Sequence, residues 1–396
     1  MKKQTHKPNL ITLSMLISIG AVSGVIFTPA MPDIAHFFGV AFSKVQLSMS
    51  FFFLAYALGQ LYSGPFCSRF GKKKTINMGL SVAFVGSLLC GISYYFDFSF
   101  LVISRFILAL GAAMGYALTF LIVSENYSHE QSRKILPKAA LGQMVLPFSS
   151  TVIGGYISQY LNWPEIFYFL CFYIILLMYL CRKFLKNIEE IARPQEKRHY
   201  NFSDYFVVLK FSHLSLFSLI VGIAVAMVFM FGTVAPFLAI HVMGLKNSHF
   251  GLMNLFLVGG NFFGMITASS ISKYFKDLLV VIFGFGLIII ASFVMIFLFI
   301  SKTMNPFALF IPTFFVFFAN CLVWANAIPL ALKGISQKAH ASAMVAFINN
   351  FCATIGILFI SAFDVTNPLL VPYMFLCGTA IQCVLFIFAR KSLPQV

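Results

Sequence analysis

The chain has 396 residues, of which 60% are hydrophobic, 17% aromatic and only 10% charged, and its mean hydropathy is +0.93. About a quarter of the residues in soluble domains are charged, so this shortage of charge excludes an ordinary soluble enzyme. The 50 Phe residues exclude a disordered chain, because they cannot all stay solvated. A net charge of +16 would suit a nucleic-acid-binding protein only as one water-facing patch, but here it falls in short clusters between apolar runs. The composition predicts a multi-pass membrane protein.

Twelve stretches of the chain are long and apolar enough for membrane helices, which need about 20 residues each. The first follows Lys2, Lys3 and Lys7, as in a secretory signal, but it is longer than a signal core and no A-x-A-like site follows it. We therefore expect an all-α membrane protein with twelve transmembrane helices. They are expected near residues 10–30, 45–65, 75–95, 100–124, 136–160, 165–184, 214–240, 250–271, 278–300, 307–332, 341–363 and 369–389.

The distribution of Lys and Arg predicts the orientation of these spans. Of the 27 Lys and Arg residues, 23 lie on the side of the N-terminus, and only Lys44, Lys246 and Lys302 lie on the other side. Cytoplasmic loops are enriched in Lys and Arg, so we expect both termini in the cytoplasm of a bacterium and the spans in its inner membrane. A missed span would invert every later loop, so the uniform bias also supports the count of twelve.

The longest polar stretch, residues 185–210, lies between the sixth and seventh spans. It predicts an N-terminal six-helix bundle in residues 1–184, a cytoplasmic linker in residues 185–210 and a C-terminal six-helix bundle in residues 211–396. This is the layout of transporters built from repeats. No segment is long enough for a nucleotide-binding or catalytic domain, so we expect neither an enzyme nor ATP-driven transport.

Cysteine and histidine patterns give no sign of a metal or redox site. The eight Cys residues form no CxxC pair, and the eight His residues show no ligand spacing. We therefore expect no disulfide framework, no metal and no cofactor. The expected partners are a small-molecule substrate and the lipid bilayer, without nucleic acid, and the expected state is a monomer.

The loop between the second and third spans reads GPFCSRFGKKKT in residues 64–75. It resembles the signature loop of the major facilitator superfamily, G-x-x-x-D-R-x-G-R/K-R/K. The resemblance implies that Gly64 allows close helix approach, that Gly71 allows a tight turn, and that the basic cluster holds the loop at the cytoplasmic face. That cluster includes Arg69, Lys72 and Lys73.

Further stretches resemble the bicyclomycin-resistance (Bcr/CflA) branch of this superfamily. They are FTPAMPDIA (27–35), VQLSMSFFFLAYALGQLYSGP (45–65), LVISRFILALGAAMG (101–115), APFLAIHVMG (235–244) and AHASAMVAF (339–347). The resemblance covers nearly the whole chain and implies the major facilitator fold, in which two six-helix bundles alternate access to a central cavity. The resemblance also implies export, because most assigned members of the resembling family expel lipophilic, often cationic compounds in exchange for protons.

Four positions depart from the pattern of the resembling family. The signature loop has Ser68 in place of Asp, and the first span has Val25 in place of an acidic residue. Phe120 replaces a charged residue in the fourth span, and Thr151 replaces a proline in the fifth. These changes weaken the expectation of proton exchange. In the family pattern the loop Asp locks the cytoplasmic side shut, so Ser68 predicts a weaker lock, with Glu125 as a candidate partner for Arg69.

Arg105 is the only charged residue deep in any expected span. An Arg in the membrane is costly unless it is paired or faces water, so it is a functional candidate. Its planar fork of donors suits an anionic or carbonyl-bearing substrate. The alternative is that Arg105 hydrogen-bonds its neighbours and braces the bundle. The matching Arg of the resembling family is a functional position, which favours a role in substrate binding or coupling.

None of the eleven Asp and Glu residues lies in the middle of a span. A proton relay needs an ionisable group in the cavity, and an Arg stays protonated in proteins. Asp33, one turn beyond Pro29, is the nearest candidate for coupling, with an interfacial cap as the alternative. We expect that transport is driven by the substrate gradient or by the membrane potential.

Neutral polar side chains are the remaining candidates for substrate binding, with hydrogen bonds between helices as the alternative for each. Residues four or seven apart lie on one face of a helix. By the same spacing, the small residues Gly111 and Gly115 predict a seam for close helix packing. The candidate pairs are Tyr56 with Gln60, Gln143 with Pro147, Asn254 with Asn261, and Asn320 with Trp324.

Three functions fit this sequence. The first is an exporter of lipophilic drugs or a related metabolite that works by alternating access of two bundles. The second is an inward-running permease for a siderophore or another nutrient, without proton antiport, which the loss of the acidic residue at Val25 favours. The third is a non-transporting membrane sensor, which is disfavoured because a scaffold gains nothing from a buried Arg105.

Overall fold

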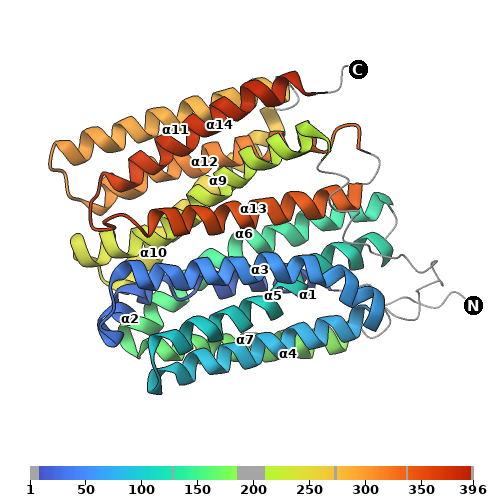
Figure 1. Cartoon of the computed structure of the whole chain (residues 1–396), viewed down its shortest axis with the longest axis horizontal. Coiled ribbons are helices and arrows are strands. Elements are labelled where there is room, and N and C mark those ends of the chain that lie inside the picture. Colours follow the sequence, from blue (N-terminus) through green and yellow to red (C-terminus); the bar gives the residue numbers. More distant parts are fainter. Residues whose placement is uncertain (1–8, 127–128, 185–209, 272–273, 336–337, 394–396) are drawn as a thin grey trace, which may run out of the picture. The chain divides into compact units, whose positions relative to one another are not determined.

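Long helices make up almost all of the described structure (Figure 1). The computed structural model describes residues 9–126, 129–184, 210–271, 274–335 and 338–393, and these contain no strand. Each of the twelve expected spans coincides with one long helix, which confirms the all-α prediction. The helices are α1 (Leu10–Val25), α3 (Phe42–Phe70), α4 (Lys72–Ile92), α5 (Phe98–Asn126), α6 (His129–Tyr160), α7 (Trp163–Phe184), α9 (Ser212–Pro236), α10 (Asn247–Ile271), α11 (Asp277–Ile300), α12 (Pro306–Ala331), α13 (Lys338–Ile360) and α14 (Leu370–Lys391).

Two of the expected spans change their helical form near a proline. The span near 10–30 ends as α1 at Val25 and continues through the short 3-10 helix η1 (Thr28–Ala30) into α2 (Met31–Phe38). Proline lacks an N–H donor and clashes with the preceding turn, so Pro29 and Pro32 prevent a continuous α-helix. The span near 214–240 is α-helical to Pro236 and then becomes the π-helix η3 (Phe237–Val242). Such π-turns occur frequently at functional sites.

Contacts divide the chain into two units. Unit 1 comprises residues 1–27 and 51–201, and unit 2 comprises residues 28–50 and 202–396. Thus η1, α2 and the beginning of α3 group with the C-terminal helices, while the rest of α3 belongs to unit 1. The division into residues 1–184, 185–210 and 211–396 stays a prediction.

Small residues allow the helices of unit 1 to approach closely. Gly111 of α5 faces the backbone of Gly79 and Ala83 on α4, and Gly115 faces the backbone of Leu16 on α1. A Cβ atom at either glycine would overlap these atoms, because the space is filled by backbone and not by a flexible side chain. The predicted seam at Gly111 and Gly115 is therefore confirmed.

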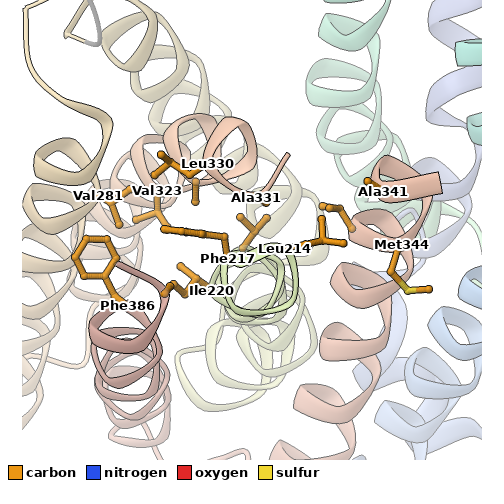
Figure 2. Packing of buried hydrophobic residues seen from close by; sticks show 14 of the residues in the cluster. Leu214, Phe217, Ile220, Val281, Val323, Leu330, Ala331, Ala341, Met344 and Phe386 are labelled. Carbon is orange, nitrogen blue, oxygen red and sulfur yellow. The ribbon is translucent and has the colours of Figure 1, made fainter. Parts of the chain in front are cut away.

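The core of unit 2 forms around α9, which packs against α12, α13 and α14. In Figure 2, Phe217 and Ile220 of α9 meet Val323 of α12, Val281 of α11 and Phe386 of α14. The rings of Phe217 and Phe386 pack edge to face with their centroids 6.4 Å apart. This arrangement is favourable for aromatic rings because the positive edge of one meets the negative face of the other.

Candidate functional site

Arg105 lies in a cradle formed by α1 and α3 of unit 1. Its side chain is 0% exposed, and its Nη2 donates to the carbonyl oxygen of Gly24 at 3.4 Å. Its Cζ lies 3.6 Å from the centroid of the Phe27 ring and 4.9 Å from that of Phe52. A cation over an aromatic face is stabilised by about 2 kcal/mol when it is desolvated. The Arg105 cation therefore packs against two aromatic rings in the buried interior of unit 1.

A glycine pair on α1 makes room for the rings of α3. The Tyr56 ring fills the place of a side chain at Gly20, and a Cβ atom at Gly24 would lie 3.1 Å from Cε1 of Phe52. Phe52 and Tyr56 stack with their centroids 6.3 Å apart, so Tyr56 extends the Arg105 cradle. Sequence reasoning named Tyr56 as a candidate but missed Phe27 and Phe52, and the available signal was the four-residue spacing of Gly20 with Gly24 and of Phe52 with Tyr56.

Two other predicted side chains of unit 1 lie partly buried. Gln60 lies one turn after Tyr56 on α3. Gln143 lies on α6 beside Gly142, which packs against Ser14 of α1. The roles of these side chains in binding stay predictions.

The predicted polar residues of α10 and α12 have different surroundings. Asn254 is buried and its Nδ2 donates to the carbonyl oxygen of Phe250 in its own helix, at 2.9 Å. Asn261 links the two helices, because its Oδ1 accepts from Sγ of Cys321 at 3.3 Å. Trp324 is 39% exposed, although it lies one turn from the buried Asn320.

Asn320 differs from the other buried asparagines of unit 2. It is 4% exposed, and neither its Oδ1 nor its Nδ2 has a hydrogen-bond partner within the described part of the chain. By contrast, Nδ2 of Asn326 donates to the carbonyl oxygen of Leu322 at 2.8 Å. Asn320 therefore retains both a donor and an acceptor for another molecule. An unsatisfied buried amide costs about 1–3 kcal/mol, and a bound molecule that paired with it would remove this cost.

Asp33 lies in the first turn of α2, within unit 2. Its Oδ2 accepts from Nδ2 of Asn247 at 2.6 Å. Asn247 begins α10, more than 200 residues further along the chain, and sequence reasoning missed it. A carboxylate in the first turn of a helix is also favoured by the helix dipole, so Asp33 joins α2 to α10 while it stabilises α2.

The signature loop is a one-residue turn between α3 and α4. Gly71 has φ +80°, which L side chains rarely adopt, and this confirms the predicted tight turn. Gly64 is half-buried in α3, Arg69 is exposed with its Cζ 5.3 Å from the Phe70 ring centroid, and Lys72 and Lys73 lie in the first turn of α4. The side chains of Ser68 and Glu125 lie outside those that the structure describes, so the conformational lock stays a prediction.

Comparisons with known proteins agree with this fold. Residues 11–361 match the family model of the major facilitator superfamily. The chain is 25% identical over 259 residues to an uncharacterized transporter of Rickettsia bellii, which covers 64% of this chain and 62% of that protein. It is 23% identical over 281 residues to multidrug resistance protein D of Escherichia coli, which covers 70% of each chain. It is 29% identical over 160 residues to a bicyclomycin resistance protein homolog of Haemophilus influenzae, which covers 40% of this chain and 39% of the relative.

Solved structures show the same fold. The xylose transporter XylE from E. coli, in a partially occluded inward-open conformation, matches with a TM-score of 0.74, 15% identity and 97% coverage of both chains. A bacterial homolog of the human lysosomal transporter Spinster matches with a TM-score of 0.70, 13% identity and at least 96% coverage of both chains. The chain is therefore a multi-pass membrane protein of the major facilitator superfamily, and a multidrug resistance protein and a bicyclomycin resistance protein homolog are among its relatives.

Proposed function

We propose that the chain exports a small amphipathic compound across the bacterial inner membrane by alternating access, with both termini in the cytoplasm. Relatives named for multidrug and bicyclomycin resistance support export, and the bias of Lys and Arg supports the orientation. The observation that carries the proposal is the buried Arg105 cation over the rings of Phe27 and Phe52.

Arg105 favours a substrate with negative charge or acceptor oxygens. Arg105 places a positive charge in the buried interior of unit 1, and electrostatic interactions are strong in a medium of low dielectric. A permanently cationic drug is therefore disfavoured near this cradle. A planar acidic compound would bind the guanidinium fork through its oxygens and the surrounding Phe rings through its aromatic surface.

The charge of such a substrate also supplies the driving force. A bacterial cytoplasm is electrically negative, so the membrane potential drives an anion outwards by about 2.3 kcal/mol per charge at 100 mV. No proton-binding carboxylate in the middle of the membrane is then required. This agrees with Val25 and Phe120 at the charged positions of the family pattern.

Transport in vesicles of known orientation tests the proposal. Everted membrane vesicles with and without the chain are incubated with an anionic dye (a carboxyfluorescein) or a cationic dye (ethidium) in the outer solution. We expect accumulation of the anionic dye only, and loss of it in Arg105→Met. Accumulation in right-side-out vesicles instead would indicate the inward permease, and binding without flux of any compound would indicate a sensor.

A further inference from the structure

Two imidazole rings meet in unit 2, just beyond the spans expected near 10–30 and 214–240. His36 lies in the last turn of α2 and His241 in the last turn of η3, and their ring centroids are 5.8 Å apart. Phe42, at the beginning of α3, packs edge-on against both rings, at 6.1 Å from His36 and 5.0 Å from His241. Both imidazoles are exposed to solvent. The three rings thus join residues 28–50 to the C-terminal part of unit 2.

Two hydrogen bonds flank this ring cluster. On one side, Asn247 of α10 donates to Asp33 of α2 at 2.6 Å. On the other side, Nε2 of Gln46 in α3 donates to the carbonyl oxygen of Thr233 in α9 at 3.2 Å, and both residues are fully buried. The ring cluster is therefore the exposed part of a contact whose other parts are fixed by hydrogen bonds.

Both histidines lie in the last turn of a helix, although α2 is an α-helix and η3 is a π-helix. Each histidine precedes by three residues a glycine in the left-handed region, Gly39 with φ +61° and Gly244 with φ +71°. Two imidazolium ions at this separation repel each other, and they no longer pack as neutral rings.

We propose that His36 and His241 form a proton-binding site that releases residues 28–50 from η3 and α10 when both imidazoles are protonated. Histidine is the side chain that changes its charge between pH 5 and 8. Above this range the neutral rings pack against Phe42 and the contact is closed. As the pH falls through this range, the second proton adds repulsion and the contact opens.

The neighbouring charges explain why the closed contact accommodates one imidazolium of the pair but not two. The charged and titratable groups that lie close to the two rings in the sequence are Asp33 on α2, Lys44 in the first turn of α3, Lys246 just before α10 and His249 in the first turn of α10. Asp33 lies one turn before His36 on α2, so its carboxylate adds negative charge on the same helix as that imidazole. The lysines add positive charge, so the second imidazolium has no balancing carboxylate among these groups.

This site regulates opening and does not carry protons across the membrane. Both rings are exposed in the closed contact, so each proton returns to the solution from which it came. The proposal therefore does not depend on which compound is transported or in which direction.

Distances between spin labels test the proposal in the full chain in lipid nanodiscs. Labels are attached to Ala41→Cys and Leu252→Cys, both exposed positions of unit 2, with the exposed Cys377 replaced by Ser. We expect the population with a longer distance to rise about tenfold between pH 7.5 and 5.5. The variants His36→Phe and His241→Phe keep a ring without a titrating group, and we expect each to keep the short distance at both pH values.

Two further variants separate the imidazole pair from its neighbours. His249→Gln removes a nearby exposed imidazole and should retain the full pH response. Asp33→Asn should favour the longer distance at both pH values, because it weakens the bond from Asn247 and removes the balancing charge. An unchanged distance in the parent chain between the two pH values, or a full response in both Phe variants, would overturn the proposal.

Discussion

The guanidinium carbon of Arg105 lies 3.6 Å from the centroid of the Phe27 ring. Phe27 is the last residue of the first segment of unit 1, and Phe52, the second ring at Arg105, lies next to Phe51, where α3 enters that unit. The two rings that contact Arg105 therefore lie beside the two unit boundaries of the chain, after Phe27 and before Phe51.

This position allows bracing and transport to be separated by two substitutions of Arg105. Arg105→Ala leaves a cavity between Phe27 and Phe52, and large-to-small changes in a core cost about 2–5 kcal/mol, so we expect a lower melting temperature. Arg105→Met fills most of the space without charge and should fold at a temperature near that of the parent. We expect flux to fall at least about tenfold in Arg105→Met, the equivalent of about 1.4 kcal/mol. Parent-like transport by this variant, measured in vesicles, would exclude Arg105 from substrate binding and coupling.

The contact of α5 with α4 makes Gly111 a sensitive position. A methyl group there meets the backbone of Gly79 and Ala83, and overpacking of a core costs about 1–3 kcal/mol. We expect Gly111→Ala to lower the melting temperature by several degrees. Gly286→Ala on α11 is the matched control, because a Cβ atom there meets nothing within 4 Å. Equal melting temperatures of the two variants, measured in detergent, would contradict the seam.

Asn320 should show opposite effects on stability and on transport. Asn320→Leu removes an amide that has no partner among the described residues, so the melting temperature should stay unchanged or rise. Asn326→Leu, the control, loses the bond to Leu322 and should be destabilised by about 0.5–1.5 kcal/mol. We expect reduced flux in Asn320→Leu if its free amide binds substrate. A variant with higher stability and unchanged flux for all transported compounds would assign Asn320 to packing alone.

The absence of mid-membrane carboxylates from the sequence predicts transport that follows voltage and not the pH gradient. In proteoliposomes the outer pH is held constant, and the internal pH is brought to the same value. This removal of the pH difference should leave flux of the anionic dye nearly unchanged. A potential of about 100 mV should move it against a gradient that increases by a factor of about fifty for each negative charge on the dye. Uphill transport driven by a pH difference alone would refute this prediction. Loss of such transport in Asp33→Asn would then identify Asp33 as the coupling group.

The sequence by itself determined the features that depend on composition and local spacing. Twelve apolar stretches of sufficient length specify twelve helices, because a bilayer requires every backbone N–H and C=O to be satisfied within its own segment. The one-residue turn at Gly71 and the small-residue seam at Gly111 and Gly115 follow from backbone sterics, which act over a few residues.

Only the tertiary structure decided which distant side chains meet. Arg105 is 78 residues from Phe27 and 53 from Phe52 in the numbering of the chain, and nothing in a pattern of 50 Phe residues marks these two as its partners. The same is true of His36 with His241 and of Asp33 with Asn247, since each pair brings together residues more than 200 positions apart. Such contacts depend on the crossing of whole helices, and helix crossings are determined by the packing of many side chains at once.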